Sequence, residues 1–293
     1  MERAARDAAA SAADASVRLQ ADDGSWRGFN DAGPMFVGET IACEAALGTL
    51  TAEHAFLAKK TLLDHQLPDG GLHPWPGASS SNAEATLFLI AGLKAVGASD
   101  DDPALMAARV RLAALGGARR AGPLASTIAA LVGAVDAALL PRVPAELALL
   151  PGHDALVARL LGVNALVPLR ALPFLWQRAR AGAFRLGRPT EAAPPSAVAR
   201  QLERYLRDRQ DPSGGIAGVP IFTLLGLLCL AACGVGGNDE AVVRGLAYVR
   251  RVYHPKPSGL AIEPYESSYW DTAHMVRALA RAPEKRHRDA ARR

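Results

Sequence analysis

The sequence is poor in residues that several common kinds of protein depend on. Its 293 residues include three cysteines, Cys43, Cys229 and Cys233, and an odd number cannot form a fully paired disulfide framework. Two of them lie four residues apart in an apolar run, so we predict buried thiols in a reducing compartment. Aromatic residues make up 5% of the chain, and none interleaves with the basic residues near its end. We therefore expect no nucleic-acid partner.

Membrane spans, leader segments and common cofactor motifs are also missing from the sequence. The most apolar run, Val219–Val235, is shorter than the ~20 residues that a bilayer span needs. No signal peptide is visible, so we expect a cytoplasmic protein. The sequence contains no phosphate-binding glycine loop and no nucleophile elbow. Its histidines, such as His65, His73 and His274, stand at turns and helix starts, so we predict neither a cofactor nor a metal site.

Helical spacing of apolar residues dominates what is present. Half of the residues are hydrophobic, and no segment alternates apolar and polar residues over a sustained length, so we predict an all-α protein. Capping residues at Thr51, at Ser81 or Asn82, and at Asp102 mark helix starts. The helices are expected at about residues 3–19, 36–50, 51–67, 82–96, 103–115, 124–135, 156–176, 196–209, 219–233, 240–252 and 268–281.

Three segments repeat one pattern at the ends of helices: a glutamine, a glycine four residues later, and a large apolar residue two residues after that. We expect the glutamine amide to bond to backbone groups of the following loop, the glycine to permit a tight turn, and the apolar residue to cover the junction. The three segments consist of Gln20, Gly24 and Trp26; Gln66, Gly70 and Leu72; and Gln210, Gly214 and Ile216.

These repeats, together with VPAELALLP from Val143 and SSYWDTA from Ser267, resemble the class II terpene cyclases, and squalene-hopene cyclases above all. The resemblance implies an α,α-toroid, a barrel of alternating inner and outer helices. Residues 1–35 resemble the leading piece of the family's first barrel, and residues 36–293 resemble its second, inserted barrel. Residues 178–199 form a short polar surface connection where the family carries an apolar membrane anchor, so we expect at most peripheral membrane contact, at the inner face.

The resemblance also implies pocket residues for a polyprenyl or triterpene-like apolar ligand. Glu39 and Glu84 match carboxylates near the water-binding end of the family's cavity, and Trp270 with Asp271 matches a W-D-T segment whose Trp lines it. Other positions depart from the family. Ser126 stands where the family has an arginine. The family's W-A-R segment is replaced around residues 164–166.

The family's acid motif, D-x-D-D, does not occur in this sequence. Asp100, Asp101 and Asp102 are consecutive and precede Pro103, which is typical of a helix start. No catalytic residue can therefore be assigned, and we expect proton-initiated cyclisation only if a partner supplies the D-x-D-D half. The expected partner is a second cyclase-half polypeptide or another copy of this chain. The alternative is a non-catalytic helical toroid that serves as a binding module. A zinc prenyltransferase is disfavoured, because no cysteine has an aspartate two residues before it.

Overall fold

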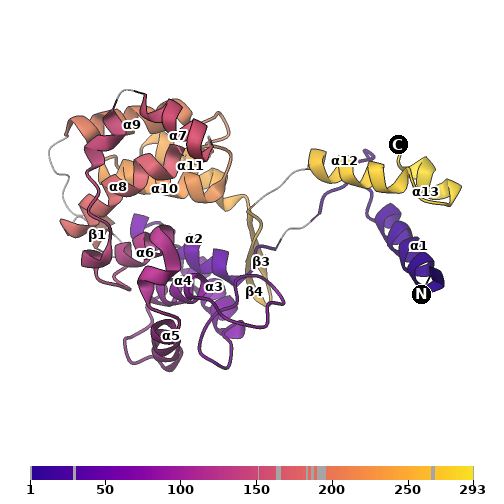
Figure 1. Cartoon of the computed structure of the whole chain (residues 1–293), viewed down its shortest axis with the longest axis horizontal. Helices are drawn as coiled ribbons and strands as arrows, with labels where there is room; N and C mark the ends of the chain where they lie inside the picture. Colours follow the sequence, from indigo (N-terminus) through magenta and orange to yellow (C-terminus); the bar gives the residue numbers. More distant parts are fainter. Residues whose placement is uncertain are drawn as a thin grey trace. The chain divides into compact units, whose positions relative to one another are not determined.

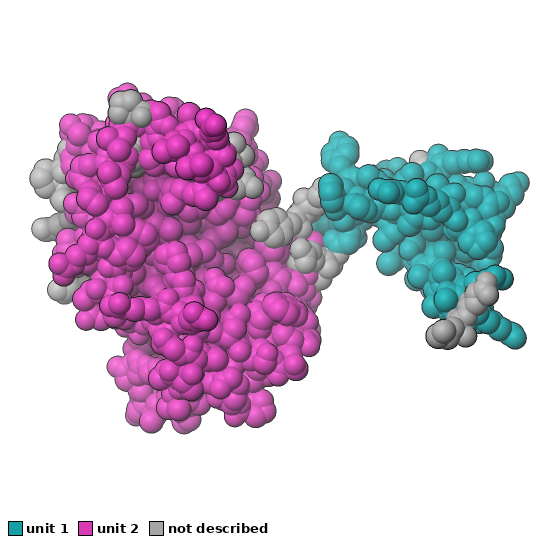
Figure 2. All heavy atoms as spheres, viewed as in Figure 1, with its two compact units in different colours: residues 1–30, 265–293 teal, residues 31–264 magenta. Residues whose placement is uncertain are grey.

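The computed structural model describes residues 2–28, 31–150, 152–162, 166–182, 184–185, 188–189, 196–264 and 268–292. The chain is mostly helical, as predicted, and its backbone contacts divide it into two compact units (Figure 2). Unit 1 consists of residues 1–30 and 265–293, and unit 2 of residues 31–264.

An inner ring of apolar helices forms the centre of unit 2 (Figure 1). Each of these helices packs against the next, and the last packs back against the first, so the ring closes. Their buried residues are mainly leucine, alanine, isoleucine and valine, which fill the core. The inner helices are α2 (Pro34–Leu47), α4 (Ala83–Ala95), α6 (Gly122–Leu131), α8 (Leu166–Arg180) and α10 (Pro220–Ala232).

Outer helices alternate with the inner ones along the chain and cover them. Helix α3 packs on α2 and α4, α5 packs on α4, α9 on α8 and α10, and α11 on α10. This alternation is that of the predicted α,α-toroid. The outer helices are α3 (Ala52–Asp64), α5 (Pro103–Ala114), α7 (His153–Leu161), α9 (Ala197–Arg209) and α11 (Glu240–Arg250), with the short 3-10 helices η1 (Ala118–Ala121), η2 (Ala137–Leu139) and η3 (Ala145–Leu149).

The predicted capping residues begin their helices. Thr51 Oγ1 accepts a hydrogen bond from His54 N at 3.1 Å, and Asn82 Oδ1 accepts one from Ala85 N at 2.8 Å. Asp102 Oδ1 accepts from Ala104 N at 2.9 Å. The aspartate at this position therefore satisfies free amides at the start of α5, as the sequence predicted.

Two short antiparallel hairpins were not predicted. Strand β1 (Phe184–Arg185) pairs with β2 (Arg188–Pro189), and β3 (Tyr253–Lys256) pairs with β4 (Gly259–Ile262). Every residue of β4 is buried, and the strand packs against α3. A strand buried on both faces shows no alternation of apolar and polar residues, so the sequence carried no signal for it.

Unit 1 contains α1 (Glu2–Arg18), α12 (Ser268–Leu279) and α13 (Lys285–Ala290), packed around Trp26. Residues 265–293 thus group with residues 1–30, whereas the sequence assigned them to the barrel that begins at residue 36. The physical reason is a small shared core, in which Leu279 of α12 and Ala290 of α13 pack with Trp26, and Trp26 N also donates to Thr272 Oγ1 at 2.9 Å. The basic end of the chain includes His287, which is 1% exposed and whose Nε2 lies 2.7 Å from Asp14 Oδ1.

The predicted surface connection 178–199 is described only in part. Residues 183, 186, 187 and 190–195 lie outside the described residues, while 178–180 end α8 and 197–199 begin α9. Within the described part of the chain, no single helix could cross a membrane. The bent pair of α7 and α8 meets that test by length and composition alone.

Candidate functional site

Each repeated glutamine ties a turn to a later helix of the chain. Gln66 Nε2 donates to Gly70 O at 2.8 Å and to Ala104 O, in the first turn of α5, at 2.9 Å. Gln210 Nε2 donates in the same way to Gly214 O at 3.0 Å and to Ala241 O of α11 at 2.8 Å. In unit 1, Gln20 Nε2 donates to Gly24 O at 2.9 Å and Ala290 O at 3.0 Å. One amide thus satisfies two carbonyls at each junction.

The repeat glycines have a conformation and a contact that a side chain would disturb. Gly70 has φ +84°, and a Cβ there would lie 2.6 Å from Ala107 O of α5. Gly214 has φ +93°, and a Cβ there would collide with Arg244 O of α11. Both glycines therefore let a turn approach an outer helix closely.

A threonine completes each repeat, which the sequence reasoning missed. Its hydroxyl accepts a hydrogen bond from the backbone N–H of the apolar repeat residue. The three bonds join Leu72 N to Thr86 Oγ1 at 3.2 Å, Ile216 N to Thr223 Oγ1 at 2.9 Å and Trp26 N to Thr272 Oγ1 at 2.9 Å. The separations in sequence are 14, 7 and 246 residues, so no fixed spacing could have revealed them.

Glu39 is buried on α2 by a close helix crossing. Gly38 lies against the carbonyl of Phe88 on α4, and a Cβ at Gly92 would lie 3.0 Å from the Gly38 Cα. Because two glycines meet there, the backbones of α2 and α4 approach closely, and Glu39 is only 4% exposed.

Glu39 makes no hydrogen bond or ion pair with the residues that the structure describes. Burial, together with the nearby charge of Glu84, raises the pKa of Glu39 to about 8. Glu84 lies in the first turn of α4 and is exposed, yet neighbouring protein atoms desolvate it enough to raise its own pKa. At neutral pH Glu39 is thus mostly a neutral carboxylic acid, able to donate one hydrogen bond and accept others.

The positions that depart from the family do not supply a charge to Glu39. Ser126 is buried on α6, and its hydroxyl donates to Ala118 O at 2.9 Å. Of the replaced W-A-R segment, residues 164 and 165 lie outside the described residues, and Leu166 begins α8.

Trp270 and Asp271 belong to α12 of unit 1. Trp270 is 66% exposed, and its ring lies 4.7 Å from that of His274. Asp271 Oδ2 accepts a hydrogen bond from Gly28 N at 2.9 Å. Of the four predicted pocket residues, the structure brings Glu39 and Glu84 together in unit 2, and Trp270 with Asp271 in unit 1.

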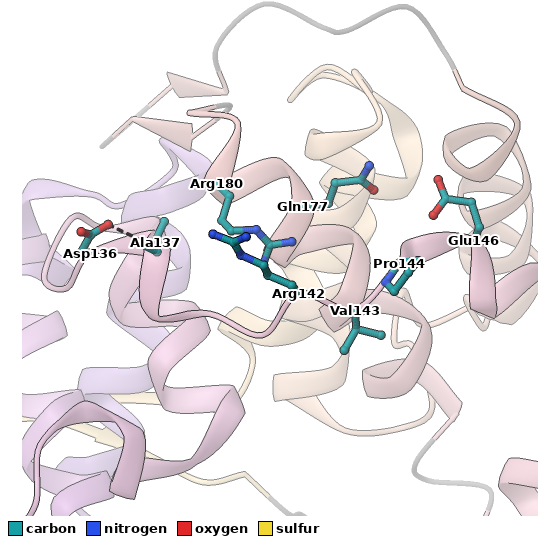
Figure 3. Close-up of a pocket in the computed structure, with 9 residues that line it drawn as sticks. Asp136, Ala137, Arg142, Val143, Pro144, Glu146, Gln177 and Arg180 are labelled. Carbon is teal, nitrogen blue, oxygen red and sulfur yellow. Dashed lines mark hydrogen bonds between the residues drawn. The ribbon is translucent and has the colours of Figure 1, made fainter.

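A wide groove of about 680 Å³ lies beside the C-terminal end of α8 (Figure 3). In it the side chains of Arg142 and Arg180 converge, and Arg180 donates to Leu140 O and Pro141 O. Asp136 and Glu146 stand at opposite edges and balance the two positive charges. This groove holds none of the predicted pocket residues.

No cluster of three or more histidines, cysteines, aspartates or glutamates suited to a metal ion occurs within the described ranges. The thiols of Cys43 and Cys229 are buried, and burial raises the pKa of each. Cys233 is partly buried, and its pKa is about 12 for the same reason. Thiols with raised pKa values are poor nucleophiles.

Comparison with known proteins gives the same family as the repeats. A family model for the squalene-hopene cyclase N-terminal domain matches residues 9–158. A squalene hopane cyclase of Aspergillus fumigatus is 26% identical over 299 aligned positions, which cover 80% of this chain and 40% of that protein. A terpene cyclase-glycosyl transferase fusion protein of Humicola fuscoatra is 27% identical over 335 positions, covering 92% of this chain and 25% of that protein. The chain therefore spans less than half the length of these relatives, and it belongs to the squalene-hopene cyclase family of class II terpene cyclases.

Proposed function

We propose that this chain supplies one half of a terpene cyclase that acts on a polyprenyl or triterpene-like hydrocarbon. The observation that carries the proposal is Glu39, a buried and mostly neutral carboxylic acid with no partner among the described residues, on an inner helix of the family's toroid. An isolated buried polar group is costly for stability, so its presence is best explained by a ligand or water that it holds.

In this proposal Glu39 and Glu84 form the polar end of an otherwise apolar pocket. The Glu39 carboxyl can donate a hydrogen bond to a bound water and accept one from it. Such a water would stand ready to quench a carbocation at the end of cyclisation. The initial proton would come from a D-x-D-D aspartate, which lies in another part of the cyclase, since a strong acid held in a dry cavity is needed to protonate an alkene.

Exposed apolar residues support the proposal that this half docks to another polypeptide. Leu156, Leu160 and Leu161 of α7 are 59%, 68% and 66% exposed, and they directly precede the replaced W-A-R segment. In unit 1, Tyr269 and Trp270 are 91% and 66% exposed. Large apolar side chains gathered in this way are typical of surfaces that another protein covers.

The test is to express the chain together with a D-x-D-D half of a squalene-hopene cyclase and assay squalene conversion by mass spectrometry. We expect a cyclised triterpene from the pair and none from either half alone. Glu39→Gln should change the ratio of hydroxylated to unsaturated products, while the exposed Glu53→Gln should not. Failure of the halves to associate, with no product, would contradict the proposal.

A second function is favoured by Ser126, whose hydroxyl is bonded to Ala118 O where the family has an arginine. Without that charge, the toroid could bind an apolar ligand and catalyse nothing. Binding of radiolabelled squalene by the chain, lost in Glu39→Gln, without turnover in the presence of any D-x-D-D half, would support this alternative over the first.

A further inference from the structure

A small pocket lies in unit 2 where the ends of α8 and α10 meet the start of α9. Its volume is about 200 Å³, and the groove of Figure 3 is larger, at about 680 Å³. Three polar residues line the pocket, namely Gln177, Arg178 and Ser196. The other lining residues are small or apolar: Phe174, Ala181, Ala199, Ala232 and Cys233.

Arg178 alone carries a charge among the described residues that line this pocket. Its Nε atom is buried and has no hydrogen-bond partner among the described residues. The charge of Glu203 reaches Cys233 in the pocket wall, but the Glu203 carboxylate pairs with Arg207 at 2.9 Å. Arginine keeps its charge at every ordinary pH, so a buried N–H of its guanidinium that lacks an acceptor is costly. Arg178 is therefore suited to an anion.

The helix ends beside Arg178 have other hydrogen-bond donors. Near the end of α8, Ala179 O accepts a hydrogen bond from Gly182 N at 3.0 Å. Near the end of α10, Ala231 O accepts one from Gly234 N at 3.0 Å. These backbone amides cap the two helices, so the guanidinium of Arg178 is not needed for that purpose.

Ser196 brings a second hydrogen-bond donor to the pocket. Its Oγ accepts a hydrogen bond from Ala199 N at 3.1 Å and so caps α9. A hydroxyl that accepts one bond keeps its own proton for another acceptor. Beside these polar groups lies the ring of Phe174, which is 4% exposed. The pocket thus combines a positive charge and a hydroxyl with an apolar wall.

We propose that this pocket binds a small monocarboxylate with a short hydrocarbon chain. One negative charge matches the single positive charge, and the two carboxylate oxygens suit the paired N–H groups of a guanidinium. The hydrocarbon chain would lie against Phe174 and Ala232. The inference does not rest on the proposed cyclisation, since none of these residues belongs to the site around Glu39.

The test uses Cys233, whose thiol lines the same pocket, as a reporter in the full chain. Iodoacetate is a small monocarboxylate that alkylates thiols, and iodoacetamide is its neutral counterpart of nearly the same size. Peptide mass spectrometry gives the rate of each reagent at Cys233, at pH 9. Burial raises the pKa of Cys233 to about 12. The ratio of the two rates does not depend on that pKa, because both reagents attack the same thiolate.

Arg178→Gln removes the proposed anchor of the carboxylate. We expect it to lower the ratio of iodoacetate to iodoacetamide rates about tenfold, the effect of losing one charge-assisted hydrogen bond. Arg204→Gln makes the same change of charge at an exposed position of α9 outside the pocket, and it should leave the ratio unchanged. Urea unfolding checks that both variants are folded. Equal ratios in the two variants overturn the proposal.

A second arm needs no variant and decides the matter if Arg178→Gln does not fold. The unaltered chain is treated with iodoacetamide in the presence of butyrate or of butyramide, at constant ionic strength. We expect butyrate to slow the modification of Cys233 and butyramide to leave it unchanged. The buried Cys229 of α10 should respond to neither solute. Equal protection of Cys233 by the two solutes, or no protection by butyrate, overturns the proposal.

Discussion

Two glutamates five residues apart on α2 have opposite surroundings. Glu39 is 4% exposed and has no partner among the described residues, whereas Glu44 is 0% exposed and accepts a hydrogen bond from Arg250 Nε at 2.8 Å. Five residues are about 1.4 turns of helix, so the two carboxyls face different sides of α2. The Glu39 carboxyl lies near Glu84 of α4, whereas the Glu44 carboxyl lies near Arg250 of α11 and Tyr253 of β3.

The surroundings of Glu44 are those of a structural link. Arg250 also donates to Thr49 O at 2.6 Å, and His54 Nδ1 lies 3.6 Å from the second Glu44 oxygen. The His54 ring packs edge-on against Tyr253 at 5.0 Å. Burial still raises the pKa of Glu44, although Arg250 and His54 act in the opposite direction. The comparison teaches that a buried acid with partners joins helices, while the one without a described partner, Glu39, keeps its carboxyl unpaired, as the proposed role in holding a ligand requires.

Removing the partner of Glu44 should have the largest effect. Arg250→Met removes the hydrogen-bonded partner of a buried carboxylate and leaves only His54, 3.6 Å away, so we expect it to lower the free energy of unfolding by roughly 3–5 kcal/mol. Urea unfolding at pH 7 measures this. Arg251→Met, which among the described residues loses a stacking contact with Tyr248, serves as the control and should cost less than about 1 kcal/mol. Equal losses in the two variants would show that Glu44 needs no partner, and the contrast with Glu39 would fail.

Neutralising Glu39 should instead stabilise the chain. Its pKa is about 8 when folded against an ordinary value of 4.5, so the folded state keeps a proton that the unfolded state releases. The stability that comes from this proton is fully present below pH 4.5 and is lost as pH rises toward 8. The difference, 8 − 4.5, sets a ceiling of ~5 kcal/mol, and relaxation around the charge reduces it to roughly 2–3 kcal/mol.

The measurement is urea unfolding of Glu39→Gln and of the unaltered chain from pH 4 to 9. The free energy of unfolding of Glu39→Gln should equal that of the unaltered chain near pH 4 and exceed it most near pH 9. A loss of stability at pH 9 would mean that the Glu39 carboxylate is paired after all.

Cys43 lies between Glu39 and Glu44 in the sequence of α2, so the rate at which its thiol is modified can report on local opening near both glutamates. Its thiol is buried, so modification by iodoacetamide requires local opening of the protein. We expect Arg250→Met to speed modification about tenfold, which corresponds to ~1.4 kcal/mol, and Glu39→Gln to slow it at pH 8. Peptide mass spectrometry separates Cys43 from Cys229, a buried thiol of α10 that should change less. A uniform change at both cysteines would indicate global unfolding instead.

Local features of this fold could be predicted from the sequence because their causes are local. The caps at Thr51, Asn82 and Asp102 depend on a side chain and an amide within three residues of it. The repeat at Gln66 combines a helix end, a turn glycine and an apolar residue within seven positions. The order of such short signals was enough to identify the toroid and the family.

Features set by distant contacts could not be predicted. The pair of Glu44 and Arg250 joins residues 206 apart in the sequence. Glu39 and Glu84 matched the family equally well, yet one is buried and the other exposed, because the crossing at Gly38 and Gly92 decides which face is enclosed. The stacking of Arg170 of α8 over the ring of Tyr205 of α9, 4.4 Å from its centroid, likewise depends on how α8 and α9 pack, which no residue spacing encodes.

The smallest predicted effect concerns the influence of Glu84 on Glu39. Glu84 is the second cause of the raised pKa of Glu39, after burial, so Glu84→Gln should lower that pKa without restoring it. We expect a shift of less than about one pH unit, because a charge near solvent is well screened. Carbon-13 NMR of the labelled carboxyl groups measures it, with Glu53→Gln as the exposed control. A larger shift would mean that Glu39 and Glu84 form a pair that shares one proton. Glu39 would then have a partner, and the contrast with Glu44 would no longer hold.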